Sequence, residues 1–419
     1  MAAPLGGGSA GLARPIDVPS QRGTGFRPMT AAPESKSSRG AHWLELFFDL
    51  VMVAYISQIA HTLHGDPSWT QTLAFFAFLA IAWWAWVNAT ITMNLFGARI
   101  TPMIWITVTL GMVALGVMAA SVAEATTDRA AAFALGNAAI RLVWVFPWLK
   151  NRRASGAPWW RPILYSVVPA SLWLVSIFTA PPWQYVLWAT ALAIEIAILS
   201  FLGRSKQTWL NETLNVEHLS ERVGLLVVIV FGESILTIIS ELDSHWSATS
   251  ALTGFLGFAA VSMLAWIFFG RASSGVTLGL RRLQLAGSVG GIRDTVMYLP
   301  FVLVAGVAMF ASALGTAVAE AGHHLPQGAA LCLGAGISLF FLASAAESLR
   351  YGAPWRDVAI WAPTGIVLPW ILVPLAASLP AEAVIAASVV IIAVLVVLTE
   401  ISTRRLRTRR DERELVAES

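Results

Sequence analysis

Apolar residues fall along this chain in twelve long runs, and short polar stretches separate the runs. Each run is close to the roughly 20 residues that a helix needs to cross the hydrocarbon core of a bilayer. The runs are continuously apolar and lack the period-2 alternation of membrane β-barrels, so they predict transmembrane helices. The pattern therefore predicts an all-α, polytopic membrane bundle with about twelve helices, at 43–64, 72–93, 102–123, 130–149, 162–180, 183–202, 220–241, 251–270, 294–318, 328–347, 357–376 and 381–401.

Lysine and arginine residues concentrate in alternate connections between these runs. The intervening connections contain only Arg129, whereas both terminal segments are rich in Arg. Because basic residues mark the cytoplasmic side of a membrane protein, both termini are expected in the cytoplasm. Two termini on one side require an even number of crossings, which agrees with twelve. We expect a multi-pass protein of the cell inner membrane.

Short sequences recur between the two parts of the chain, which predicts a tandem duplication. GAPWW at 156–160 returns as GAPWR at 352–356, and SVAEA at 121–125 returns as AVAEA at 317–321. Six crossings in each half would make the two repeats parallel, related by an axis along the membrane normal. The expected organisation is a disordered cytoplasmic tail (1–41), a first six-helix repeat (42–203), a cytoplasmic linker (204–217), a second six-helix repeat (218–402) and a basic cytoplasmic tail (403–419).

Composition supports a membrane location and excludes several classes of site. Hydrophobic residues make up 57% of the chain and charged residues 12%, so the lipid bilayer is its first expected partner. The single cysteine, Cys332, permits neither an intrachain disulfide nor a thiolate metal cluster. No phosphate-binding loop, nucleophile elbow or zinc-ligand spacing occurs, so we expect no cofactor and no metal. The C-terminal arginines are interpreted as a topology anchor beside anionic lipid, not as a nucleic-acid site; the oligomeric state stays open.

Two carboxylates occupy the first predicted helix. Glu45 and Asp49 lie four residues apart and therefore share one face near the cytoplasmic end. Carboxylates that close repel each other unless a cation or hydrogen-bond donors lie between them. For Glu45 alone, a simpler interpretation is that its charge favours the helix N-terminus.

The seventh predicted helix carries Glu221, Arg222 and Glu233. Eleven residues separate Arg222 from Glu233, roughly 16 Å along a helix axis, so these two side chains cannot pair with each other. Glu233 falls near the middle of the membrane and needs another explanation. Small neighbours, Gly232 and Ser234, would let another helix approach it closely.

Two further charges lie within predicted helices, Arg141 in the fourth and Glu195 in the sixth. A charge at the bilayer centre costs about 2.5–3.5 kcal/mol, so such residues should face the interior and pair. Arg141 can neutralise either Glu195 or Glu233, which would leave the other acid without a cation. Such an acid suits a proton-coupled site or an acid/base catalyst. The alternative is a closed ion-pair network that only locks helices together.

Three segments resemble the hallmarks of a known family. ELFFDLV at 45–51, WWAW at 83–86 and ERVGLLVVIVFGES at 221–234 are similar to motifs of the bacterial low-temperature-requirement A family. The resemblance implies a polytopic inner-membrane protein, and the family's name refers to a growth phenotype and not to a reaction. Carried onto this chain, the family pattern points to Glu45, Asp49, Glu221, Arg222, Gly232 and Glu233. The chain departs from that pattern in MNLFGAR at 93–99, which lacks acidic residues, and at Pro300, where the family tends to carry a His.

Two functional hypotheses of different classes follow. The first is a secondary transporter or permease for an unknown small molecule or ion, with a site lined by Asp49, Arg141, Glu195 and Glu233. Coupling of this transport to proton movement is part of the hypothesis. The second is an intramembrane enzyme acting on a lipid-like or apolar substrate, with Glu45 and Asp49 as acid and base. A third hypothesis, a scaffold that senses the state of the membrane, rests on the family name alone.

Overall fold

The computed structural model describes residues 43–97, 101–155, 160–202 and 214–418. Helices dominate these ranges, and they contain no extended strand. The expected N-terminal tail 1–41 and residues 204–213 of the expected linker lie outside the described residues. The expected basic tail from residue 403 continues the last helix as far as Glu418.

Ten helices in the described ranges are long and apolar enough to cross a membrane. Each corresponds to one of the predicted segments. They are built from α1 (Trp43–Ala60), α2 (Trp69–Phe96), α3 (Pro102–Ser121), α4 (Ala130–Val143) with α5 (Val145–Ser155), α8 (Trp183–Leu202), α10 (Val216–Ser244), α11 (Ala248–Leu285), α12 (Val289–Arg293) with α13 (Leu299–Ala319), α14 (Gln327–Arg350) and α18 (Ala381–Glu418).

The other two predicted segments, 162–180 and 357–376, form shorter apolar helices over Ile163–Ser176 and Ala362–Ala376. Proline explains the interruption, because it lacks an N–H group and its ring collides with the preceding helical turn. The pieces are α6 (Trp160–Pro162), the π-helical turn η3 (Ile163–Val167) and α7 (Val168–Ser176) in the first case, and α15 (Trp355–Val358), α16 (Ala362–Val367), the 3-10 turn η5 (Leu368–Ile371) and α17 (Leu372–Ala376) in the second.

Two π-helical turns each end two residues before a proline. The turn η3 precedes Pro169, and a second turn, η4 (Asp294–Tyr298), precedes Pro300 at the start of α13. A wider turn at this point accommodates the ring and the lost N–H donor. The carbonyl of Met297, within η4, accepts a hydrogen bond from Trp83 Nε1 at 2.7 Å, which ties α2 to the start of α13.

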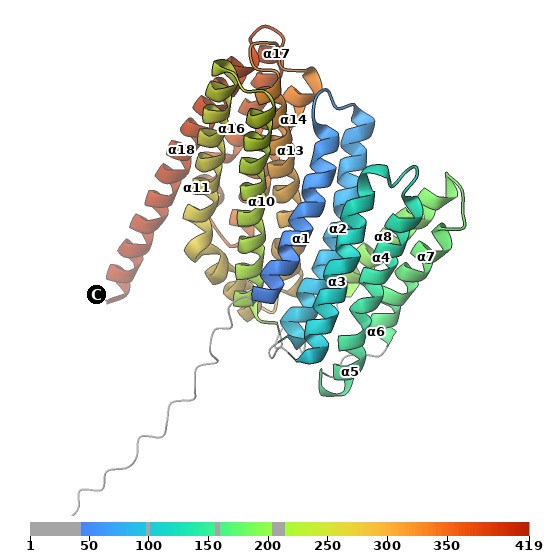
Figure 1. Cartoon of the computed structure of the whole chain (residues 1–419). Helices are drawn as coiled ribbons and strands as arrows, with labels where there is room; N and C mark the ends of the chain where they lie inside the picture. Colours follow the sequence, from blue (N-terminus) through green and yellow to red (C-terminus); the bar gives the residue numbers. More distant parts are fainter. Residues whose placement is uncertain (1–42, 98–100, 156–159, 203–213, 419) are drawn as a thin grey trace, which may run out of the picture. The chain divides into compact units, whose positions relative to one another are not determined.

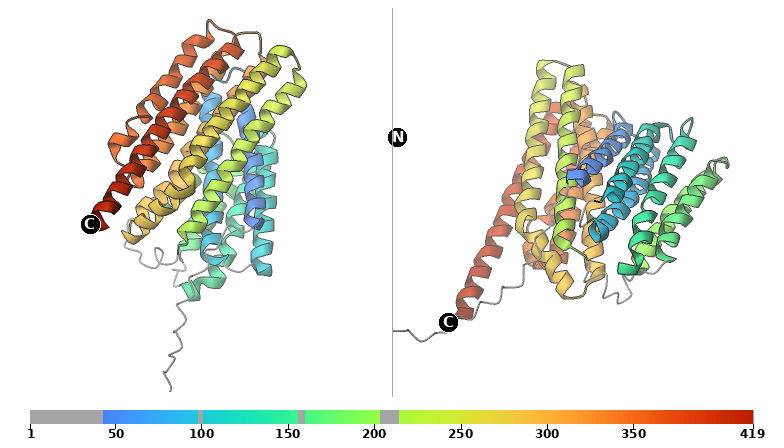
Figure 2. Two further views of the ribbon diagram at one scale, coloured as in Figure 1. Left: turned by 90° about the vertical axis from the view of Figure 1, so that its left-hand side faces the viewer. Right: turned by 60° about the horizontal axis from the view of Figure 1, so that its bottom comes forward.

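The two halves of the chain meet along a seam formed by α1 and α2 on one side and α10 and α13 on the other (Figure 1). We call the end of the bundle where α1 and α10 begin the lower end, as drawn in Figure 1. The opposite end, where α1 leads into the 3-10 turn η1 (His61–Leu63), is the upper end. The last helix, α18, packs along α11 and ends at the lower end (Figure 2).

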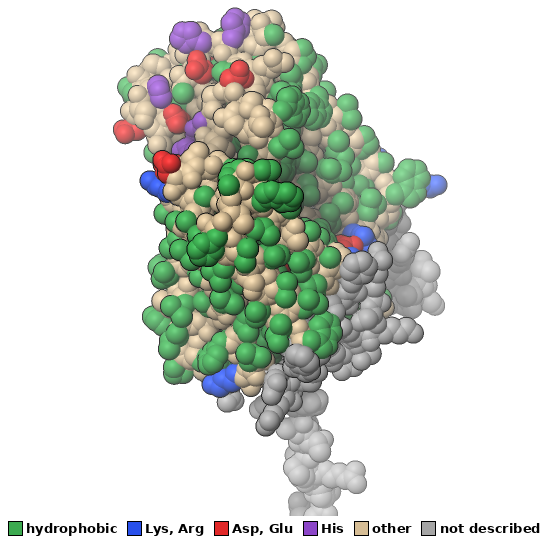
Figure 3. Space-filling model, turned by 90° about the vertical axis from the view of Figure 1, so that its right-hand side faces the viewer, with side chains coloured by type: hydrophobic (Ala, Val, Ile, Leu, Met, Phe, Trp, Pro, Cys, Tyr) green, Lys and Arg blue, Asp and Glu red, His purple; other side chains and the backbone are tan. Residues whose placement is uncertain are grey.

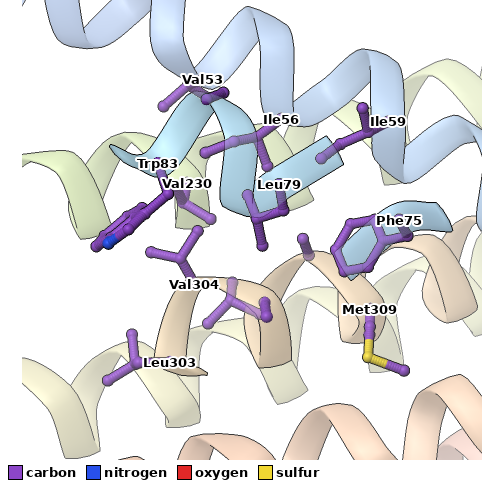
Figure 4. Packing of buried hydrophobic residues seen from close by; sticks show 14 of the residues in the cluster. Val53, Ile56, Ile59, Phe75, Leu79, Trp83, Val230, Leu303, Val304 and Met309 are labelled. Atoms are coloured by element: carbon purple, nitrogen blue, oxygen red, sulfur yellow. The ribbon is translucent and has the colours of Figure 1, made fainter. Parts of the chain in front are cut away.

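Apolar side chains fill the seam between its ends. Figure 4 shows Ile56 of α1, Leu79 of α2, Val230 of α10 and Val304 of α13 converging on one packed region. On one outer face, hydrophobic side chains cover the middle of the molecule, whereas histidine and acidic side chains gather at the upper end (Figure 3). Apolar exposure of this kind is what a lipid environment stabilises.

Helix α13 is enclosed by protein on all sides. The stretch Val289–Ala319 that contains it is 89% buried over its most apolar 18 residues. Its tightest contact is with α14, where a Cβ atom built on Gly306 would lie 2.8 Å from the carbonyl oxygen of Gly336. Small residues at such positions let membrane helices approach closely.

We therefore expect Gly306→Val to destabilise the protein by about 1–3 kcal/mol, the range that overpacking a filled core costs. Thermal unfolding of purified protein in detergent measures this change. Gly116→Val is the matched control, because a Cβ at Gly116 meets no atom within 4 Å. Equal unfolding temperatures for the two variants would contradict the close contact between α13 and α14.

Candidate functional site

Four ionisable side chains meet across the seam at its lower end. Glu45 and Asp49 come from successive turns of α1, and His218 and Arg222 from successive turns of α10; all four are at most 1% exposed. Arg222 Nη1 lies 3.3 Å from Glu45 Oε2, and Nη2 lies 3.1 Å from Asp49 Oδ1. His218 Nε2 lies 2.8 Å from Glu45 Oε2. We call these four residues the seam cluster.

The seam cluster explains how the two neighbouring carboxylates, Glu45 and Asp49, can lie close together in a buried position. Arg222 is the cation between them, so their mutual repulsion is offset by one guanidinium that bonds to both. Glu45 does more than favour the start of α1, because it is buried and paired across the seam. As expected from helix geometry, Arg222 bonds to these acids and not to Glu233.

Hydrogen bonds around His218 fix the tautomer of its ring. The amide of Asn94 is oriented by Asn215, whose N–H donates to Asn94 Oδ1 and whose carbonyl accepts from Asn94 Nδ2. The second hydrogen on Asn94 Nδ2 points to His218 Nδ1 at 3.0 Å. Nδ1 must therefore accept, and Nε2 carries the hydrogen that it donates to Glu45. The ring is a neutral bridge between α2 and α1.

Aromatic rings enclose the seam cluster. Trp86 Nε1 donates to Asp49 Oδ1 at 2.7 Å, and the Arg222 guanidinium lies 5.5 Å from the Trp86 ring and 5.9 Å from the Phe48 ring. Cation–π attraction of this kind stabilises a desolvated charge. Two atoms stay without a hydrogen-bond partner despite full burial, Asp49 Oδ2 and Arg222 Nε.

Arg141 and Glu195 form a separate, closed pair between α4 and α8. Arg141 Nε and Nη2 donate to the two Glu195 oxygens at 2.8 and 2.9 Å, and both side chains are fully buried. The remaining Arg141 nitrogen, Nη1, donates to Asn137, and the guanidinium lies 5.4 Å from the Trp173 ring. Of the two acids that Arg141 could neutralise, it therefore pairs with Glu195.

Glu233 remains as the acid without a cation. It is partly buried on α10, and it forms no hydrogen bond or ion pair with any residue that the structure describes. Its side chain lines a small cavity of about 10 Å³ between α1, α10 and α13, which we call the upper cavity. Ser57 and Ser312 also line it, and the Ser312 hydroxyl is buried without a partner. This volume is close to the minimum for one water molecule.

Two histidines close the upper cavity toward the upper end of the bundle. His61 and His64 line it, with ring centroids 4.7 Å apart, and Glu241 Oε1 lies 3.6 Å from His64 Nδ1. That distance is too long for a hydrogen bond. Burial, and secondarily the neighbouring His61, lower the pKa of His64 to about 4 from the ordinary value of 6.5.

Glu221 stands apart from the seam cluster. It is exposed on α10, roughly 100° around the helix axis from Arg222, and it lines a larger cavity of about 410 Å³ between α10, α11, α13 and α14. We call this the lower cavity. The predicted site residues therefore do not converge on one chamber: Glu45, Asp49 and Arg222 lie together, Arg141 and Glu195 form a second pair, and Glu233 and Glu221 face separate cavities.

Sequence reasoning left out several members of these sites. His218 shares a helical face with Arg222 at a spacing of four, a signal that could have included it. Asn94, Trp86 and the seryl lining of the upper cavity come from other helices, and no spacing along the chain connects them. Among the described residues, no group of three His, Cys, Asp or Glu side chains could hold a metal ion.

Comparison with known proteins places these residues in a family. Residues 40–399 match the family described as bacterial low temperature requirement A protein, or LtrA. The chain belongs to the LtrA family. It is also similar to the uncharacterized protein RA0937 of Rhizobium meliloti (strain 1021), with 28% identity over 253 residues. That match covers 56% of this chain and 60% of the length of RA0937. The LtrA match includes all of the seam cluster and both cavities.

The Arg141–Glu195 pair generates a stability prediction. Arg141→Met leaves a buried carboxylate without its cation, which we expect to cost about 3–5 kcal/mol of unfolding free energy. Arg129→Met breaks the exposed pair with Glu124 and should cost less than about 1 kcal/mol. Thermal or denaturant unfolding in detergent compares them. If Glu195→Leu added to Arg141→Met restored no stability, a purely structural pair would be the wrong account.

His64 generates a prediction on pH. Its folded pKa of about 4 is below 6.5, so the unfolded chain binds more protons between these values. Stability should therefore fall as the pH falls from about 6.5 toward 4, and His64→Gln should make this fall shallower. Unfolding temperatures measured between pH 7.5 and 5 test this. Nearby groups that also titrate are His61, Glu241 and His245, so an unchanged slope in His64→Gln would assign the effect to them.

Proposed function

We propose that the protein is a secondary transporter in which Glu233 takes up and releases a proton as the two halves of the bundle move. The observation that supports this most directly is the state of Glu233: partly buried in a membrane helix, unpaired within the described structure, and facing a cavity of about one water. Intramembrane carboxyl groups are costly and mark proton or ion pathways. A carboxyl group without a fixed cation can exchange a proton without breaking an ion pair.

The arrangement of polar and apolar layers along the seam supports alternating access. The seam cluster lies at the lower end and Glu233 toward the upper end, with Met52 and Ile56 of α1 and Leu226 and Val230 of α10 buried between them. This apolar layer separates the two polar ones, as in a closed state of a transporter. Because α1 and α10 start the two halves, relative motion of the halves would open the layer.

The wider architecture of the proposal is two parallel six-helix repeats, with both termini in the cytoplasm and the lower end on the cytoplasmic side of the cell inner membrane. Two observations favour it. The fifth segment of each half is the short one, over Ile163–Ser176 and Ala362–Ala376. Also, α1 begins and α18 ends at the same end of the bundle (Figure 1), which agrees with an even number of crossings.

The rival function, an intramembrane enzyme with Glu45 and Asp49 as acid and base, gains less support. Both carboxylates are engaged by Arg222, and neither lines the upper or the lower cavity. A general acid or base must come within hydrogen-bond reach of its substrate. In this conformation the seam cluster holds helices together, and neither cavity brings a substrate within hydrogen-bond reach of Glu45 or Asp49.

The test is proton movement in proteoliposomes that contain an internal pH indicator. A panel of small solutes is added outside under an imposed pH gradient, and we expect a responsive solute to drive proton flux in the wild-type protein. Glu233→Gln keeps the shape of the side chain but cannot ionise, so it should lower proton-linked flux by about 10²-fold or more, the scale on which a lost proton-transfer group acts.

Glu124→Gln is the matched control, since Glu124 lies in the exposed pair with Arg129. It should transport like the wild-type protein. If the wild-type protein and Glu233→Gln behaved alike across the whole panel, with no proton-linked flux in either, the transport function would be wrong.

A further inference from the structure

The upper cavity is a small polar chamber enclosed by three membrane helices. Each helix contributes a side-chain oxygen to its lining: Ser57 from α1, Glu233 from α10 and Ser312 from α13. The other polar side chains of the lining are Thr237, His61 and His64. A volume of about 10 Å³ is close to that needed by one water molecule, so an organic solute does not fit. The size is that of a single small ion or water.

The oxygen atoms that face this cavity are not engaged elsewhere. The Glu233 carboxylate and the hydroxyls of Ser57 and Ser312 make no hydrogen bond or ion pair with any residue that the structure describes. Ser312 is only 1% exposed. A serine inside a helix commonly bonds to the carbonyl four residues earlier, as Ser234 does with Val230. The Ser312 hydroxyl forgoes that bond, and a ligand in the cavity would supply the missing partner.

Charge favours a monovalent cation in this position. Glu233 is the one Asp, Glu, Lys or Arg side chain that lines the cavity within the described part of the chain. Its single negative charge lies in a membrane helix, where a net charge is costly. One monovalent cation would balance it, whereas a divalent ion would leave an excess positive charge and an anion would add a second negative one. His64 adds no charge at neutral pH, because its pKa is lowered to about 4.

A cation can approach the cavity from the upper end of the bundle. On the lower side Ile56 and Val230 close it, each 2% exposed, whereas His61 on the upper side is exposed to the surroundings. Acidic side chains gather at this end of the molecule (Figure 3). One of them, Glu241, lies 3.6 Å from His64 at the edge of the cavity. Carboxylates near an entrance attract cations toward it.

We propose that the upper cavity is a sodium site, in which Na⁺ binds the Glu233 carboxylate and the hydroxyl oxygens of Ser57 and Ser312. Na⁺ is a hard cation, and hard cations take oxygen ligands of these kinds. Water from the side of His61 would complete the coordination. K⁺ is larger, and a chamber of about one water suits the smaller ion. As a statement that Na⁺ is exchanged for the proton of Glu233, this inference rests on the transport function proposed above; as a binding site it does not.

The experiment measures binding of radioactive Na⁺ to the purified full-length protein in detergent. Choline chloride holds the ionic strength constant, and a buffer of about pH 8 keeps ordinary histidine side chains neutral. We expect saturable binding that unlabelled NaCl displaces and that an equal concentration of KCl does not. Thermal unfolding without Na⁺ is recorded for every variant, so that a loss of binding is separated from a loss of folding.

Two variants test the location of the site. Glu233→Gln removes the charge, and we expect Na⁺ to bind at least about tenfold more weakly, which corresponds to about 1.4 kcal/mol. Ser312→Ala removes a hydroxyl that has no partner, so binding should weaken several-fold while the unfolding temperature without Na⁺ stays at the wild-type value.

Each variant has a matched control outside the cavity. Glu124→Gln neutralises an acid of an exposed ion pair. Ser388→Ala removes a buried hydroxyl of α18 that bonds to the carbonyl of Ile385 in its own helix. Both controls should bind Na⁺ like the wild-type protein.

The outcomes separate this inference from the transport function. Undiminished binding in Glu233→Gln or in Ser312→Ala would place the ion elsewhere, and displacement by KCl as strong as by NaCl would show attraction to charge without selection of Na⁺; any of these results overturns the proposal. Saturable Na⁺ binding with the expected properties, in a protein that moves no protons, would support the site and refute only the transport function. Proton-linked flux without saturable Na⁺ binding would refute the site and leave the transport function supported.

Discussion

The cost of placing charge in lipid is the constraint on which this structure depends. An unpaired charge in the bilayer interior has a high free-energy cost, so each buried guanidinium must lie next to carboxylates that pair with it. Arg222 joins α10 to α1 by bonding to Glu45 and Asp49, and Arg141 joins α4 to α8 by bonding to Glu195. The first of these contacts lies between the halves and the second within one half. The two ion pairs thus link α10 with α1 and α8 with α4, while apolar side chains fill the rest of the core.

The polar groups inside the membrane divide into two kinds by their hydrogen bonding. Arg141 and Glu195 satisfy each other and are insulated from both cavities, which suits a structural role. The Ser312 hydroxyl is buried without a partner, and Glu233 has none among the described residues; the two line one cavity, which suits a role in binding or proton exchange. The seam cluster is intermediate, because its pairs are made but Asp49 Oδ2 and Arg222 Nε are left without partners in a fully buried site. A buried polar atom in that state favours any rearrangement that supplies a partner.

Hydropathy alone located nearly all of the membrane helices, because a long apolar run has few alternatives in lipid. The shortening of the helices at 163–176 and 362–376 was harder to predict, since proline breaks a helix without changing the hydropathy that identifies it. For the site, the spacing of four between Glu45 and Asp49 correctly placed both on one face. The partner of Arg141 could not be chosen from the sequence, because Glu195 and Glu233 both fall inside predicted membrane helices and only the folded chain brings Glu195 of α8 to Arg141 of α4. The lower cavity could not be predicted from the sequence either, since it is made by four helices whose lining residues share no local pattern.

The enclosure of α13 bears on how the chain is assembled during biosynthesis. A segment as apolar as this one can enter the bilayer by itself, yet in the folded protein its surroundings are almost entirely other helices. Lipid must therefore be exchanged for protein neighbours after insertion, and the hydrophobic effect gives little help because both surroundings are apolar. The glycine, alanine and serine residues of α13 make that exchange favourable by letting backbones come into contact. The sequence of α13 thus meets two requirements: it is apolar enough to insert into the bilayer, and its small residues allow other helices to replace the surrounding lipid.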